Sequence, residues 1–321
     1  MAPPVPTGLT SVPVIDLAPF DGPDPVGRGH VVEQVRRACE EVGFLVVTGH
    51  GIAPDLLERM GAVSREFFDL PEPVKAVHRH PERGARYVPL GSEAVAASLD
   101  LVTPPDLKEA YSIYRLDTDE WPSRPAAMRA TWREYYRALA GLAERVMRIF
   151  ALALDLDEHW FADKIDRADA SLWVSNYPAQ LVEPEPGQLR AGPHTDYDTL
   201  TLLKVEDVPG GLQVEIEPGV WADVPYVPGS YVVNIGDLMS RWTNDRWVST
   251  MHRVTNPPPG SGPAARRQSI VFFHKPNDDA MITPLPTCVG PEGPRYAPVL
   301  AGEYMTEKGR KQDTSHGRDE P

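Results

Sequence analysis

The amino-acid sequence predicts a mixed α and β fold in which helices pack on a double-stranded β-helix, or jelly-roll barrel. The first half of the chain places apolar residues at helical spacing. After Trp160 the pattern changes to short apolar runs separated by proline and glycine. Because each half must bury its apolar face against another element, we expect an N-terminal and central helical layer on a closed sheet.

Two helices are expected near the N-terminus, after a proline-rich arm at residues 1–11. Apolar residues recur at helical spacing over 31–42, among charged residues that would face solvent. Pro54 suits the first turn of a second helix, since its missing N–H would have no intrahelical partner there. Proline and glycine then interrupt the stretch 81–105, which is expected to be irregular.

A long amphipathic helix is expected over residues 125–154, and the strands follow it. The apolar face of this helix contains Tyr135, Leu139, Leu142, Val146 and Ile149. Strands are expected at 172–177, 199–203, 212–216, 231–235 and 269–273. The predicted segments are an N-terminal helical and strand module, a supporting helix with its connector, a jelly-roll core, a C-terminal segment and a flexible tail, at 12–115, 125–165, 168–280, 281–308 and 309–321.

Composition excludes several classes of protein. The chain of 321 residues has 46 acidic and 32 basic residues, and its net charge of -14 would repel polyanions, which argues against nucleic acid as a partner. No window approaches the ~20 apolar residues of a membrane span, and no secretory signal is recognisable. Two distant cysteines, Cys39 and Cys288, fit a reducing cytoplasm.

One group of residues predicts a metal site. His194 and Asp196 precede the strand expected at 199–203, so on an extended chain their side chains would share a face, with Cα atoms roughly 6.6 Å apart. His252 lies in a second β-prone run that ends at Pro257. Two neutral imidazoles and one carboxylate leave open positions on an ion, and this set favours non-haem Fe(II) that reacts with dioxygen. Zinc is the competing occupant.

A His-x-Asp string alone is common by chance and is more often a turn or a surface pair. A third element changes this balance. Arg267 and Ser269 begin a strand whose same face continues with Val271 and Phe273, so the guanidinium needs an anionic partner. A guanidinium fork matches a carboxylate, and the serine hydroxyl adds a donor. An internal Asp or Glu partner is the alternative.

The order of these strings resembles the 2-oxoglutarate and Fe(II)-dependent dioxygenases of the isopenicillin N synthase-like family. The similarity covers roughly residues 12 to 280. Its strings lie at 12–17, 38–52, 192–197, 210–214, 233–237, 241–244, 249–254 and 269–273.

The resemblance implies a jelly-roll barrel that holds Fe(II), with 2-oxoglutarate as the co-substrate of O2. It implies that His194, Asp196 and His252 are the iron ligands and catalytic residues. Arg267 and Ser269 would hold the far carboxylate of 2-oxoglutarate. Tyr177 is similar to a family tyrosine that contacts the co-substrate, although Ser175 stands where many relatives have Asn.

The implied activity is hydroxylation, desaturation or cyclisation of a small organic molecule, with release of succinate and CO2. Secondary metabolism, such as antibiotic biosynthesis, is the expected setting. Because alternate residues of a strand share a face, several residues are expected to line the substrate cavity. They are Thr250, Val254, Val271 and Phe273, with Arg86 and Tyr87 from the irregular stretch. Two alternatives stay open: an oxidase like isopenicillin N synthase that uses no 2-oxoglutarate, and a non-catalytic binder of small molecules. The substrate and the oligomeric state are not fixed by the sequence.

Overall fold

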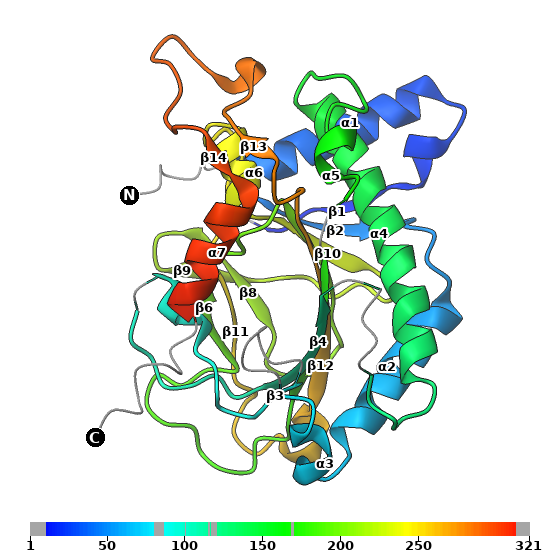
Figure 1. The fold of residues 1–321 in the computed structure, drawn as a ribbon, viewed down its shortest axis with the longest axis vertical. Helices are drawn as coiled ribbons and strands as arrows, with labels where there is room; N and C mark the ends of the chain where they lie inside the picture. The colour runs from blue at the N-terminus through cyan, green and yellow to red at the C-terminus, as the bar shows by residue number, and fades with distance from the viewer. Residues whose placement is uncertain are drawn as a thin grey trace.

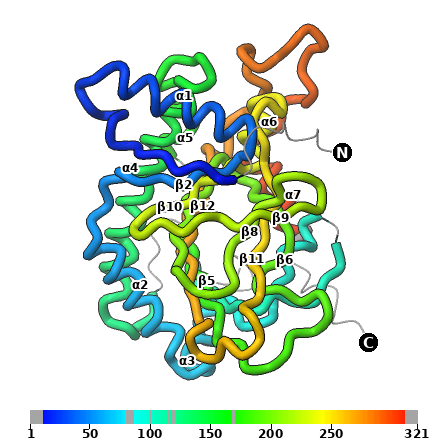
Figure 2. The backbone as a smooth tube through the Cα atoms, turned by 180° about the vertical axis from the view of Figure 1, so that it is seen from behind, coloured from blue at the N-terminus to red at the C-terminus, as the bar shows by residue number. Residues whose placement is uncertain are grey.

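Two sheets face each other to form the barrel. The computed structural model describes residues 11–79, 87–99, 101–114, 116, 121–167 and 170–312. The larger sheet has eight strands in the order β1-β2-β10-β7-β12-β5-β4-β3, and the smaller has four in the order β6-β11-β8-β9. Figure 2 shows the smaller sheet on the side of the molecule opposite the long helix α4. The expected jelly-roll fold is confirmed.

The strand bounds locate the elements that carry the site. The larger sheet contains β1 (Val14–Asp16), β2 (Phe44–Thr48), β3 (Tyr87–Val88), β4 (Glu109–Tyr114), β5 (Ser171–Tyr177), β7 (Leu200–Lys204), β10 (Tyr231–Ile235) and β12 (Arg267–His274). The smaller contains β6 (Ala191–His194), β8 (Leu212–Glu217), β9 (Val220–Asp223) and β11 (His252–Val254). A hairpin-like pair, β13 (Met281–Ile282) and β14 (Val299–Leu300), lies outside the barrel sheets.

The helices cover one side of the larger sheet. Figure 1 shows α2 and α4 side by side along the barrel, and α7 on the opposite side. The helices are α1 (Pro25–Glu41), α2 (Pro54–Phe68), α3 (Glu72–Ala76), α4 (Met128–Ala153), α5 (Ala162–Ile165), α6 (Asp237–Trp242) and α7 (Ala301–Gln312). Short 3-10 turns lie at Ala18–Asp21, Val95–Leu99, Gly262–Ala265 and Pro286–Cys288. The expected helices at 31–42, after Pro54 and within 125–154 are therefore present.

The start of α1 shows how local sequence fixes an element. Asp24 caps the helix, because its side chain accepts hydrogen bonds from the backbone N–H groups of Val26 and Gly27, both at 3.0 Å. Pro25 occupies the first helical position, where no intrahelical N–H donor is needed.

Strand alternation divides the core into two clusters. Ile270 and Phe272 of β12 pack in the outer cluster between the sheet and the helices, with residues such as Trp132 of α4. Phe44 and Tyr177 belong to the inner cluster between the two sheets. Because side chains alternate along a strand, Arg267, Ser269, Val271 and Phe273 face the barrel interior. The two faces of the larger sheet therefore differ in polarity: the outer face is apolar and the inner face is partly polar.

Two expected segment bounds differ from the structure. Strands β1 to β4 of the module 12–115 join the same sheet as the strands of the core 168–280, so the sheet does not divide there. The helix α7 runs to Gln312, so the first residues of the expected tail 309–321 are helical, because they continue a helix that begins on buried Ala301. Residues 313–321 lie outside the described part of the chain.

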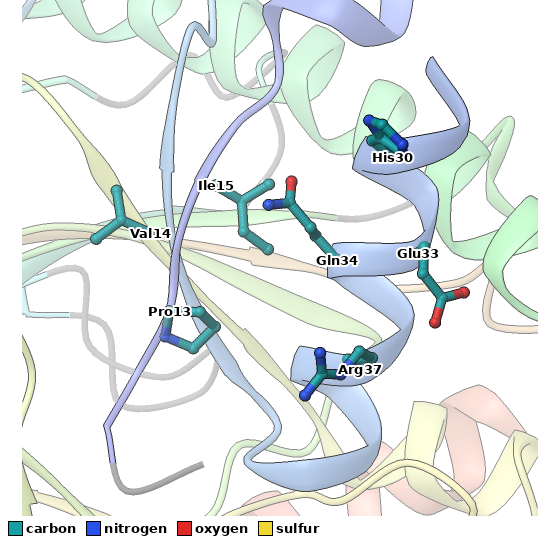
Figure 3. Close-up of a pocket in the computed structure, with 7 residues that line it drawn as sticks. All are labelled: Pro13, Val14, Ile15, His30, Glu33, Gln34 and Arg37. Atoms are coloured by element: carbon teal, nitrogen blue, oxygen red, sulfur yellow. The ribbon is translucent and has the colours of Figure 1, made fainter. Parts of the chain in front are cut away.

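A surface groove of about 420 Å³ lies between α1 and the edge strand β1. Figure 3 shows Ile15 and Gln34 on its two sides. None of the candidate site residues lines it, so it is separate from the predicted metal site. Within the described ranges, no helix is long and apolar enough to cross a membrane.

Candidate active site

Three predicted ligands converge between the two sheets. His194 ends β6 and His252 begins β11, and the two residues are direct partners in an antiparallel pair. Their ring centroids lie 4.2 Å apart. One donor atom from each histidine and one from Asp196 all lie within 4.8 Å of one another. This separation allows a single ion to contact all three groups.

The backbone selects the nitrogen that each imidazole presents. Nδ1 of His194 lies 2.8 Å from the carbonyl oxygen of Gly192, and Nδ1 of His252 lies 3.1 Å from that of Thr250. A carbonyl can only accept a hydrogen bond, so Nδ1 of each ring carries the proton and donates. The lone pair of each Nε2 is then free for a metal.

The carboxylate of Asp196 is held from one side. Its Oδ2 accepts hydrogen bonds from Thr201 at 2.5 Å and from the amide of Asn234 at 2.6 Å. Its Oδ1 faces the histidines, at 4.0 Å from Nε2 of His194 and 3.7 Å from Nε2 of His252. One oxygen is therefore fixed by the protein while the other points to the centre of the group.

The electrostatic state of the group suits a divalent cation. Burial, reinforced by the neighbouring His252, lowers the pKa of His194 to about 3. Burial opposes ionisation of Asp196, but the histidines and the two hydrogen bonds outweigh it, and the pKa of this carboxyl lies below its usual value. At neutral pH the site therefore holds a neutral imidazole beside a carboxylate, as metal binding requires.

Arg267 is buried in the same interior with incomplete hydrogen bonding. It is 1% exposed, and its Nη2 donates to the hydroxyl of Ser269 at 3.2 Å. Its Nε and Nη1 have no partner among the described residues. The guanidinium also borders a cavity of about 420 Å³. An unpaired buried guanidinium is costly, and no Asp or Glu among the described residues hydrogen-bonds to Nε or Nη1 of Arg267.

Tyr177, expected from the resemblance to contact the co-substrate, lies beside Arg267. The two residues are cross-strand partners between β5 and β12, and the guanidinium carbon lies 5.1 Å from the centre of the tyrosine ring.

Arg190 was missed by sequence reasoning. It is 1% exposed and its guanidinium carbon lies 5.8 Å from the ring of Tyr177. It donates to the carbonyl oxygens of Pro209, Gly210 and Ala265, and Ala265 lies two residues before the start of β12. Arg190 thus ties the strand that carries Arg267 to the opposite sheet. In the sequence, the one feature that could have pointed to Arg190 was its position directly before β6, the strand that ends at His194.

The residues that hold Asp196 were also missed. Thr201 and Asn234 interrupt apolar strands with polar side chains, and this interruption was the signal available. Asp237, the first residue of α6, is linked to the same segment. Its backbone N–H donates to the carbonyl of Asp196 at 2.8 Å, and its carboxylate accepts from Ser249 at 2.8 Å, Tyr304 at 3.2 Å and Lys308 at 3.0 Å. Asp237 therefore joins the metal loop to α7.

Two interpretations of the sequence need correction. His194 and Asp196 do not share one strand face, because β6 ends at His194 and Asp196 lies in the turn that crosses to β7 of the other sheet. Tyr87 does not line the interior. Its hydroxyl donates to Glu72 at 2.5 Å and Glu109 at 2.7 Å under the helices, since β3 presents it on the outer face.

The other nominated wall residues have mixed outcomes. The hydroxyl of Thr250 donates a hydrogen bond to the backbone carbonyl of Val42. Val254 packs in the inner cluster. Phe273 lies 6.4 Å from the inward ring of Trp173, measured between centroids, and its place in the substrate wall stays a prediction, as does that of Val271. Arg86 lies outside the described residues.

Comparison with known protein families matches two models in the order of the chain. Residues 12–135 match the N-terminal region of a non-haem dioxygenase in morphine synthesis, and residues 170–276 match the 2OG-Fe(II) oxygenase superfamily. A 2-oxoglutarate-Fe(II) type oxidoreductase, hxnY of Emericella nidulans, is 36% identical over 97% of this chain and 92% of its own length. The chain belongs to the 2OG-Fe(II) oxygenase superfamily.

Two further proteins are similar to this oxygenase over most of its length. Validamycin A dioxygenase of Streptomyces hygroscopicus subsp. limoneus is 32% identical over 93% of this chain and 86% of its own length. The crystal structure of Neurospora crassa T7H with alpha-KG and thymine has a TM-score of 0.82 and 31% identity, and covers 94% of this chain and 96% of that one. The predicted family, jelly-roll fold, enzyme class, Fe(II) and 2-oxoglutarate are confirmed.

Proposed function

We propose that this dioxygenase binds Fe(II) through Nε2 of His194, Nε2 of His252 and Oδ1 of Asp196. The convergence of these three atoms at the junction of the two sheets carries the proposal. Two imidazoles and one carboxylate on one side of an ion match the facial ligand set of non-haem iron oxygenases. The opposite side of the ion is left for other ligands.

Arg267 and Ser269, with Tyr177 beside them, would hold the distal carboxylate of 2-oxoglutarate. The unpaired nitrogens of Arg267 support this role, because a carboxylate supplies the acceptors that the protein does not. When bound, Fe(II) and 2-oxoglutarate supply the oxidation of a C–H bond by O2, with release of succinate and CO2.

The protein's own residues prepare this chemistry by orientation and charge. The carbonyls of Gly192 and Thr250 fix the imidazole tautomers, and Thr201 with Asn234 fixes the carboxylate. Phe44 packs edge-on against the ring of His252, with centroids 5.3 Å apart, and limits its rotation. The side chains of His194, Asp196 and His252 are 16%, 7% and 9% exposed, so each electrostatic contact acts in a medium of low polarity.

The primary substrate in this proposal is a small organic molecule. Validamycin A and thymine, which appear in the names of two relatives, are both small and polar. The net charge of -14 disfavours a nucleic acid substrate. A role in secondary metabolism accords with the validamycin relative.

Anaerobic addition of Fe(II) and 2-oxoglutarate to the purified protein tests the site. The expected result is a weak visible charge-transfer band that His194→Ala, Asp196→Ala and His252→Ala each abolish. A full band in any folded variant would remove that residue from the ligand set. Succinate released in proportion to oxidised substrate separates this function from an oxidase that uses no 2-oxoglutarate, and from a non-catalytic binder.

A further inference from the structure

Lys108 forms a row with Tyr177 and Arg267 on the inner face of three adjacent strands. In the β4–β5 pair Glu109 is opposite Asn176, and in the β5–β12 pair Arg267 is opposite Tyr177. Glu109 and Asn176 hydrogen-bond to each other at 2.8 Å on the outer face. The preceding residue, Lys108, therefore points to the interior at the level of Tyr177.

Among the described residues, the ammonium group of Lys108 has one carboxylate within hydrogen-bond distance. Its side chain is 10% exposed, and Nζ lies 3.2 Å from Oε2 of Glu93. Oδ2 of Asp106 lies 4.0 Å from Nζ, beyond hydrogen-bond distance. An ammonium group has three donors, so at least one more acceptor is expected nearby when ligands are bound.

Asp106 connects this lysine to β6, the strand that ends at His194. Its two carboxylate oxygens accept from the backbone N–H groups of Gly192 at 2.9 Å and Val95 at 3.1 Å. Gly192 lies on β6, two residues before His194. The hydrogen bond from Gly192 therefore links Asp106, which lies beside Lys108, to the strand that ends at His194.

Three cationic side chains lie around Tyr177, and among the described residues only Lys108 has a carboxylate, that of Glu93, within salt-bridge distance at 3.2 Å. Arg190 and Arg267 both lie over its ring, and Lys108 directly precedes β4, whose first residue, Glu109, is opposite Asn176. Burial, together with repulsion from Arg267, lowers the pKa of Arg190 to about 10. Ser175, the next inward residue of β5, has a short side chain. A dianion placed before Tyr177 would relieve this repulsion.

We propose that Lys108 is a second cationic contact for the distal carboxylate of 2-oxoglutarate, on the side of Tyr177 opposite Arg267. This inference rests on the proposed function of Arg267. Strands in a sheet are spaced by about 4.8 Å, so the Cα atoms of Lys108 and Arg267 lie roughly 10 Å apart, and both long side chains can reach one carboxylate. Glu93 and Asp106 act as positioning residues that keep the ammonium at this place.

Calorimetric titration of 2-oxoglutarate into the Mn(II)-loaded protein, without oxygen, tests the inference. Lys108→Met is expected to weaken binding about tenfold or more, the effect of one hydrogen bond to a charged group. Lys108→Arg should retain affinity within a few-fold. Lys164→Met removes the same charge from α5, where Lys164 pairs with Asp163 at 2.7 Å, and should bind normally. Circular dichroism confirms that each variant is folded.

A second ligand identifies the group that Lys108 contacts. 2-Oxopentanoate lacks the distal carboxylate, so Lys108→Met should reduce the preference for 2-oxoglutarate over this analogue by the same factor. If the folded variant binds both ligands as wild type does, or loses affinity for both equally, the inference is overturned. Arg267→Met is the internal standard, because an unchanged preference in that variant would overturn the proposed function instead.

Discussion

Asn234 offers a sharp test of how the protein holds its metal ligand. Its amide donates to Oδ2 of Asp196 at 2.6 Å, and its own side chain is 2% exposed. Asn234→Leu keeps a similar volume and removes the donor. Thr201 then remains as the partner of that oxygen.

The expected loss of affinity follows from the hydrogen bond itself. A bond to a charged group contributes about 1.5–3 kcal/mol, which corresponds to roughly 10- to 100-fold in a binding constant. Loss of an outer partner of a metal ligand typically costs about the same factor, 10- to 100-fold. The two estimates agree, so we expect the metal affinity of Asn234→Leu to fall within this range.

A Co(II) titration of the metal-free protein, followed by visible absorbance, measures this affinity. Asn176→Leu is the matched control, because Asn176 is also 2% exposed and donates to a carboxylate, that of Glu109, on the outer face of the sheet. The control should lose stability and keep its Co(II) affinity. Equal affinities of Asn234→Leu and wild type, within twofold, would refute the orienting role of the amide.

Three further predictions follow from buried ionisable groups. Arg267→Met should weaken 2-oxoglutarate binding by about 100-fold or more in calorimetry, since two charge-assisted bonds are lost, while Co(II) affinity stays unchanged. Lys75→Met should lower the free energy of unfolding by about 3 kcal/mol in urea titrations, because the buried carboxylate of Glu109, 2.6 Å from Nζ, loses its cation. The double variant, Lys75→Met with Glu109→Gln, should recover part of this loss. Burial lowers the pKa of His274 to about 4, so the folded state excludes a proton that the unfolded chain binds below about 6.5. The stability from this group is present above about pH 6.5 and is lost as pH falls towards 4. In urea titrations, the free energy of unfolding of His274→Gln should fall less between pH 7 and pH 5 than that of wild type. An equal fall in the two proteins would contradict the assignment.

Local pattern was sufficient for most of the elements. Helical spacing at 31–42 and 125–154 predicted α1 and α4, and breakers around short apolar runs predicted β5 and β10. These patterns are reliable because the period of the apolar residues depends on backbone geometry within a single element. The order and spacing of the polar strings then identified the family.

The sequence by itself determined which residue types were available to the site. His194, Asp196, His252 and Arg267 could be nominated because two imidazoles, a carboxylate and a buried guanidinium have few structural uses in combination. The preference of these side chains for a metal ion or an anion follows from residue type alone.

Tertiary structure decided which atoms meet. The crossing of the chain from β6 to β7 brings Asp196 to the histidines from a turn, and strand pairing sets Lys108, Tyr177 and Arg267 in one row. Asn234, Thr201 and Arg190 became recognisable only in the folded chain, because a polar residue in an apolar strand acquires its role from the partner opposite it. Pairing between strands distant in sequence depends on the whole barrel closing, and no local pattern encodes that.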